Sequence, residues 1–147
     1  MVERALILAL VAAMVAAVVL AAGWWSRRGV AGLRTAPADG LWSALGTSPD
    51  GRPSLVVFST PSCTACRTAQ HPAVEAVEAS FGSAVRVLKV DLSRQPIAAA
   101  AFKVLTAPST ALLTGDGRLG SFNHGFAPAD QLSAQLSALG ASPVSTR

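Results

Sequence analysis

Residues 54–66 read SLVVFSTPSCTAC, and this segment is the most informative part of the chain about its fold. The apolar run 54–59 has the length and composition of a buried strand. Cys63 and Cys66, the only cysteines in the 147 residues, follow it closely and are separated by two residues. If a helix begins at Cys63, its unpaired N–H groups and the positive end of its dipole stabilise a thiolate there. Cys66 then lies one turn further on the same face, so the spacing predicts a thiol–disulfide exchange site with Cys63 as nucleophile and Cys66 as resolving thiol.

The remaining patterns alternate between strands and helices. A helix is predicted over 63–80, with a kink at Pro72 because proline lacks the N–H that an interior helical residue donates. Asp116-Gly117 marks a hairpin turn. Further strands are expected over 84–90, 109–113 and 119–122, and further helices over 96–103 and 127–139. This order predicts an α/β fold, a mixed sheet with helices on both faces.

The N-terminus carries a second strong signal. From Ala5 to Trp25 the chain has 21 residues without a charge, which as a helix span the hydrocarbon core of a bilayer. Trp24 and Trp25 stand where an aromatic interface belt is expected. A cleaved signal peptide is the alternative, but the apolar run is longer than a typical signal core. No cysteine follows closely, so a lipoprotein anchor is not expected.

The charges beside this run bear on its orientation. Arg4 precedes it, whereas Arg27, Arg28 and Arg34 follow it. The positive-inside rule therefore predicts a single-pass protein of the cell membrane with its C-terminal domain in the cytoplasm. An extracytoplasmic domain stays open, because a CxxC site suits an oxidising compartment as well.

Composition bounds the organisation of the chain. The predicted segments are a transmembrane anchor over 1–25, a juxtamembrane linker over 26–53, one domain over 54–139 and a flexible tail over 140–147. The linker holds a possible short helix or docking segment at 41–45. The net charge is +4, yet the basic residues beyond the membrane edge are scattered, and nucleic-acid binding is not expected.

Metal binding is the alternative use of the two cysteines. Zinc prefers four ligands, and His71 and His124 are the only other soft candidates, at spacings that fit no zinc pattern. We interpret His71 as a solvated helix residue and His124 as a structural or exposed loop residue. No metal or organic cofactor is predicted.

The chain resembles thioredoxin over roughly 54–139. The strand leading to the CxxC, Val90-Asp91 at the end of the next strand, the segment 102–110 with Ala107-Pro108, and the Asp116-Gly117 turn occur in the family's order. The resemblance implies a thioredoxin fold after one N-terminal transmembrane helix. It also implies that Pro108 is cis and that Ala107 offers its backbone to an incoming peptide.

The chain departs from the family's pattern at several positions. Ser62 replaces the usual Trp before the first cysteine, and Ala65 replaces the proline between the cysteines. Val57 and Val87 occupy the positions of the family's buried Asp and Lys, so an apolar pair replaces an ion pair. Pro72 stands one residue later than the family's kink proline.

These observations predict a membrane-tethered thiol–disulfide oxidoreductase that exchanges disulfides with protein substrates, acting as a reductase. Its partners would be protein disulfides, and a reductase or a membrane thiol carrier as electron donor. The alternative is a non-catalytic thioredoxin-fold module that binds partners through its peptide groove.

Overall fold

A computed structural model of the chain describes residue 7, residues 10–24 and residues 38–144. The chain divides into two compact units, residues 1–35 and residues 36–147. In the first unit, residues 10–24 are helical. No helix within the described residues combines the length and the apolar character needed to cross a membrane. The predicted anchor over 1–25 and the basic residues after it fall partly or wholly outside the described residues.

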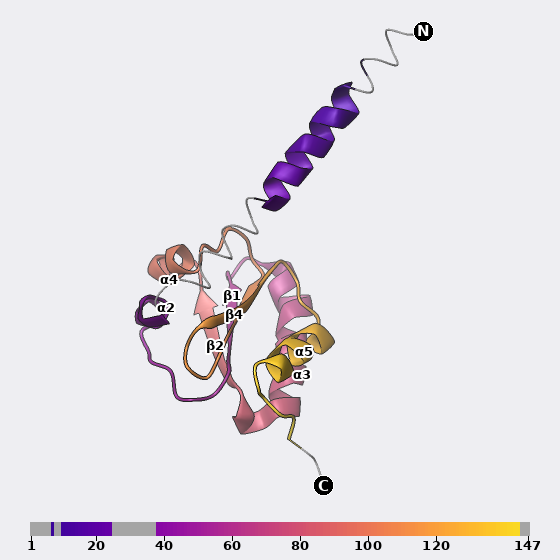
Figure 1. Ribbon diagram of the computed structural model, residues 1–147. Helices are drawn as coiled ribbons and strands as arrows, with labels where there is room; N and C mark the ends of the chain where they lie inside the picture. Colours follow the sequence, from indigo (N-terminus) through magenta and orange to yellow (C-terminus); the bar gives the residue numbers. More distant parts are fainter. Residues whose placement is uncertain (1–6, 8–9, 25–37, 145–147) are drawn as a thin grey trace. The chain divides into compact units, whose positions relative to one another are not determined.

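The second unit is a four-stranded sheet with helices on both faces (Figure 1). The strands lie in the order β2-β1-β3-β4, with β1 parallel to β2 and antiparallel to β3, and β3 antiparallel to β4. They are β1 Ser54–Ser59, β2 Arg86–Asp91, β3 Ser109–Leu113 and β4 Leu119–His124. The helices are α2 Ala38–Leu45, the π-helix Cys66–Gln70, α3 His71–Phe81, the 3-10 turn Gly82–Ala84, α4 Pro96–Ala101 and α5 Ala129–Ala138. This is the predicted mixed α/β sheet.

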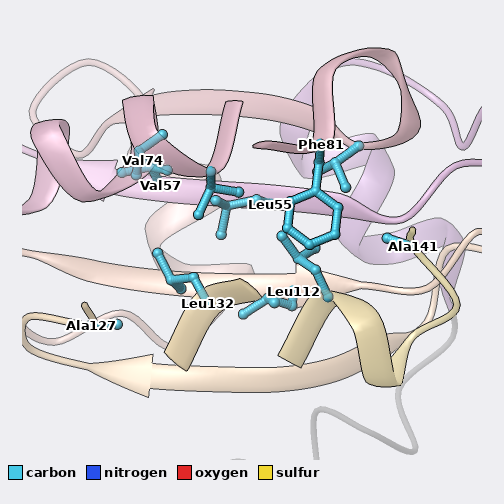
Figure 2. Packing of buried hydrophobic residues seen from close by; sticks show 11 residues of the cluster. Leu55, Val57, Val74, Phe81, Leu112, Ala127, Leu132 and Ala141 are labelled. Atoms are coloured by element: carbon cyan, nitrogen blue, oxygen red, sulfur yellow. The ribbon is translucent and has the colours of Figure 1, made fainter. Parts of the chain in front are cut away.

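Strand β1 is buried on both faces because it lies between β2 and β3 and under both helical layers. Its five residues from Ser54 to Phe58 are all buried, and alternate side chains point to opposite faces. Leu55 and Val57 join a cluster with side chains of β3, α3 and α5 (Figure 2). On the other face, the rings of Phe58 and Phe102 lie with centroids 5.1 Å apart. In Figure 1, α3 and α5 cover one face and α2 and α4 the other.

Helix α2 belongs to the compact unit, although the sequence analysis placed its residues in a linker. Leu41 and Trp42 are buried, and Trp42 Nε1 donates a hydrogen bond of 2.8 Å to the carbonyl of Gly117. The possible docking segment at 41–45 is thus a helix that packs on the domain. Residues 38–53 are part of the unit that holds the sheet.

The end of the chain packs in a similar way as far as the structure describes it. Ala141 is buried in the core cluster, and the N–H of Val144 donates to the carbonyl of Ser80 at 2.8 Å. Residues 140–144, predicted as the start of a flexible tail, therefore cover the end of α3.

The helix predicted over 63–80 is present, and its helical backbone runs without a break over residues 64–81. Within it, residues 66–70 form a π-helix, in which the N–H of His71 donates to the carbonyl of Cys66, five residues back. Pro72 follows in the first turn of α3. The π-turn holds one residue more than an α-turn, which accommodates the later position of the proline.

Candidate active site

The carboxyl end of β1 leads directly into the two cysteines. The strand ends at Ser59, and the N–H of Cys63 donates to the carbonyl of Thr60 at 3.1 Å, closing a turn before the helix. Helical backbone begins at Thr64, one residue after the predicted start. Cys63 therefore stands at the N-terminal end of a helix, where free backbone N–H groups favour a thiolate.

The two cysteines form a disulfide, with an S–S distance of 2.13 Å and 5.3 Å between their Cα atoms. Their exposures differ sharply: Cys63 is half-buried, whereas Cys66 has no accessible surface. The N–H of Cys66 also donates to Cys63 Sγ at 3.1 Å. A thiol from another protein can therefore reach Cys63, while Cys66 can react only with a partner already joined to Cys63.

Arg67 brings a positive charge into this segment. Its Nη1 donates to the carbonyl of Pro61 at 3.2 Å, which holds the guanidinium against the turn before Cys63. Because the Arg67 side chain is exposed, it stabilises a thiolate at Cys63 by about a few tenths of a kcal/mol at most.

The core next to the site is apolar where the thioredoxin resemblance implies an ion pair. Val57 is 1% exposed, and Val87 packs against the same cluster. The β1–β2 register pairs Leu55 with Val87 and Val57 with Lys89, so Val57 and Val87 are diagonal neighbours on one face. Hydrophobic packing thus replaces a buried Asp and Lys in this chain.

A proline loop lies at the same edge of the sheet. The Ala107–Pro108 peptide bond is cis, the geometry that the resemblance implies. Pro108 is buried and Ala107 half-buried. Ser109, the first residue of β3, is paired with Phe58 near the end of β1, which places the loop beside the segment that leads to Cys63. Ala107 and Pro108 thus lie at the same edge of the sheet as the segment that carries Cys63 and Cys66.

Gln70, which the sequence analysis did not single out, has the most informative surroundings near the site. It is fully buried at the end of the π-helix, four residues after Cys66. Its Nε2 donates to the carbonyl of Ala127 at 3.1 Å, and its Oε1 accepts from the N–H of Ala127 at 3.0 Å. The late position of Pro72 was the one signal that could have drawn attention to this segment.

The two histidines do not lie together with the thiols in one cluster. His71 is half-buried at the start of α3, and His124 is exposed, with its ring 4.6 Å from that of Phe122. Within residues 7, 10–24 and 38–144, no group of three or more His, Cys, Asp or Glu side chains is arranged to hold a metal ion.

Solved structures of other proteins are similar to this chain in fold. Thioredoxin from Fasciola hepatica is 27% identical, with 60% of this chain and 81% of that one covered at a TM-score of 0.53. Thioredoxin-2, a component of the malaria parasite's protein secretion machinery, is 23% identical, with 59% and 82% covered at a TM-score of 0.56. The dsbF protein of MTB, in mixed oxidized and reduced forms, is 21% identical, with 60% and 81% covered at a TM-score of 0.51.

Sequence comparison leads to the same family. A comparison with curated proteins finds no match. The thioredoxin family model, however, matches residues 47–138, well over half of the chain. With the fold and a cysteine pair at disulfide distance, this match is consistent with thiol–disulfide chemistry. The chain belongs to the thioredoxin family.

Proposed function

We propose that this protein is a membrane-tethered thiol–disulfide oxidoreductase that reduces disulfides in protein substrates. One observation carries the proposal: an accessible cysteine, Cys63, is paired with a fully buried one, Cys66. A disulfide placed only to stabilise the core would have no need of one reachable sulfur beside a helix N-terminus.

The proposed reaction starts from the reduced pair. The thiolate of Cys63 attacks one sulfur of the substrate disulfide; the Cys63–substrate bond forms, and the other substrate sulfur leaves as a thiolate that takes up a proton. The thiol of Cys66 gives up its proton and attacks Cys63 Sγ, which forms the observed disulfide and releases the second substrate thiol. The substrate gains two electrons, and a reductase or a membrane thiol carrier returns them to the cysteine pair.

Ala107 and Pro108 are the proposed docking residues. They lie at the same edge of the sheet as the cysteines, and the cis bond turns the backbone sharply there. In this proposal the backbone of Ala107 hydrogen-bonds an extended substrate segment beside Cys63.

The reaction can be tested on the full chain purified in detergent. Equilibration in thiol–disulfide buffers, with trapping of free thiols, should give one reversible two-electron transition. A midpoint of about −270 mV supports a reductase, and one of about −120 mV an oxidant. Thiols that never pair over this range would refute the redox proposal.

Trapping of a covalent intermediate tests the two cysteine roles. Cys66→Ser should accumulate mixed disulfides between Cys63 and protein substrates, because the resolving thiol is absent. Cys63→Ser is the matched control and should trap little, because the remaining sulfur is buried. Equal trapping by both variants would contradict the assignment.

The membrane anchor and the cytoplasmic orientation are part of the proposal. The support is the uncharged run 5–25 and the arginines that follow it. After cell fractionation the chain should stay with membranes through an alkaline wash. Intact cells are treated with a reductant and then with a membrane-impermeant maleimide, which should leave Cys63 unlabelled. Labelling of Cys63 would show that the domain lies outside the cytoplasm.

A non-catalytic binding module is the second candidate. The apolar pair Val57 and Val87 favours it, because the carboxylate that would help deprotonate Cys66 in the resemblance is missing. A binding module should retain its partners when both cysteines are replaced by Ala. Recovery of partners only through a covalent bond would eliminate this candidate.

A further inference from the structure

We infer that Gln70 is a positioning residue for thiol–disulfide exchange with protein substrates: it locks the loop 125–128 to the π-turn that begins at Cys66. This inference rests on the proposed function and adds a residue to its machinery. Gln70 is one of four buried polar side chains among the described residues, and it makes two hydrogen bonds to one residue 57 positions away.

The hydrogen bonds of Gln70 leave the loop little freedom beside the site. Its amide donates to the carbonyl of Ala127 and accepts from the N–H of the same residue, so the two planar groups form a closed pair. Ala127 is itself fully buried in the core cluster. In the view of Figure 2, Ala127 lies toward the same end of this cluster as Val57 and Val74, and Phe81 and Ala141 lie at the other.

The loop that Gln70 holds lies at the edge of the sheet where the proposed substrate docks. It follows β4, whose last residue, His124, pairs with Ser109 directly after the cis proline. The loop carries Phe126, a large apolar side chain that is 50% exposed although its neighbour Ala127 is fully buried. An exposed ring on this loop can contact a protein substrate that docks at the same edge of the sheet, and the backbone of the next residue, Ala127, is held by Gln70.

The π-turn explains why glutamine reaches the loop. The extra residue between Cys66 and Pro72 rotates the residues before α3 relative to a continuous α-helix, and Gln70 faces the core there rather than solvent. A buried amide without partners would destabilise the fold, so the backbone of Ala127 and the side chain of Gln70 are matched to each other.

Loss of the Gln70 hydrogen bonds should affect the reduction of protein substrates and leave that of small disulfides unchanged. Gln70→Met keeps the length and apolar bulk of the side chain and removes both hydrogen bonds. The loop then loses its fixed position, and docking of a protein substrate weakens while the sulfurs keep their own geometry. For insulin reduction by the full chain in detergent, we expect KM to rise about tenfold with kcat changed less than about twofold. The rate with the small disulfide DTNB should stay within about twofold of wild type.

Two further variants keep the test decisive if Gln70→Met is unstable. Gln70→Glu keeps an acceptor for the N–H of Ala127, and the protonated carboxyl that burial favours can donate to its carbonyl with altered geometry, so its KM should lie between those of wild type and Gln70→Met. Val77→Ala lies in the core cluster, seven residues further along the chain than Gln70, and leaves both hydrogen bonds of Gln70 in place. It controls for a general loss of stability and should leave the KM for insulin unchanged.

The outcomes distinguish this inference from the proposed function. Two results with an active wild type would overturn the positioning role alone. In the first, Gln70→Met loses as much activity with DTNB as with insulin. In the second, Val77→Ala raises the KM for insulin as much as Gln70→Met does. A wild type that reduces neither disulfide overturns the proposed function, and the inference with it. A KM rise for insulin alone, absent in Val77→Ala, supports both.

Discussion

Single residues around the cysteines show how this site differs from the pattern that the thioredoxin resemblance implies. Val57 is almost fully buried in an apolar cluster, and Lys89, which the register places opposite it, is paired with Glu78 at the surface. In the proposed reaction, Cys66 therefore resolves a mixed disulfide without a buried carboxylate at this position. The chain gains apolar packing where an ion pair would need desolvation.

Val57→Asp should destabilise the protein strongly. An unpaired carboxylate in this cluster should lower the free energy of unfolding by about 3–5 kcal/mol at pH 7.5. Burial raises the pKa of the new carboxyl in the folded state, so the folded state binds more protons and the loss shrinks as the pH falls toward 4.5. Urea unfolding at the two pH values measures this, with Val57→Thr as a neutral control. A pH-independent loss would show that the introduced carboxyl reaches solvent.

Asp91 should contribute to stability in a pH-dependent way. The hydroxyl of Ser93 donates to its Oδ1 at 2.6 Å and the N–H of Ser93 at 2.9 Å, and these bonds lower the pKa of Asp91 below 3.8. Because the folded-state pKa is depressed, the contribution is present above the unfolded value and lost as the pH falls through the folded one. Asp91→Asn should thus be less stable than wild type at pH 7, and the difference should narrow in acid. Ser93→Ala, which removes the hydroxyl that donates to Asp91, should weaken the same pH dependence.

At the scale of elements, the hairpin between β3 and β4 is held by more than its turn residues. The N–H of Thr114 donates to the carbonyl of Arg118 and that of Gly117 to the carbonyl of Thr114, both at 2.8 Å. Gly117 has a φ of +88°, and its carbonyl accepts the hydrogen bond from Trp42. The hairpin and α2 therefore stabilise each other across 75 residues of sequence.

Gly117→Ala should disrupt this junction. A Cβ there would lie 2.5 Å from Trp42 Nε1, in addition to the cost of a positive φ. Gly51→Ala is a matched control, because Gly51 has a φ of +86° and nothing within 4 Å of the new atom. We expect a loss of roughly 1–2 kcal/mol for Gly51→Ala and a further 1–3 kcal/mol for Gly117→Ala, measured by urea unfolding. Equal losses would mean that Trp42 moves aside without cost.

At the scale of the whole molecule, the domain extends beyond the strands and the cysteine pair. Helix α2 adds a buried tryptophan to the face opposite α3 and α5, and the guanidinium of Arg86 lies 5.8 Å from the centroid of that ring. Arg86 also donates to the carbonyl of Ser48 and the hydroxyl of Thr47. Residues 47–48 are thereby joined to strand β2, and the unit that unfolds together should include α2.

Trp42→Ala should lower the free energy of unfolding of the full chain by about 3–5 kcal/mol. Trp42→Phe keeps most of the ring but leaves the carbonyl of Gly117 without its donor, and should cost about 1–3 kcal/mol. Far-ultraviolet circular dichroism during urea unfolding measures both as shifts of a single transition. A Trp42→Ala variant as stable as wild type would show that α2 is not part of the cooperative unit.

The sequence by itself determined the family, the order of strands and helices, and the pairing of Cys63 with Cys66. These features depend on short-range patterns, namely apolar runs, turn residues and cysteine spacing. Each pattern lies within a short segment and can be recognised without knowing the rest of the fold. The predicted strand over 84–90 begins two residues before β2 and ends one residue before it, and the predicted strand over 119–122 ends two residues before β4 does. The cis geometry of Pro108 came from the family resemblance and not from the residues alone.

Only the tertiary structure decided how far each cysteine is exposed, that Gln70 is buried against Ala127, and that α2 packs on the hairpin. The last two features depend on contacts between residues 57 and 75 positions apart, which no local periodicity records. A polar glutamine and a helix in a Gly- and Pro-rich segment look solvent-exposed in sequence. Both are buried here because distant backbone groups supply the hydrogen bonds that burial requires. Ala127 pairs with Gln70, and the carbonyl of Gly117 pairs with Trp42 of α2.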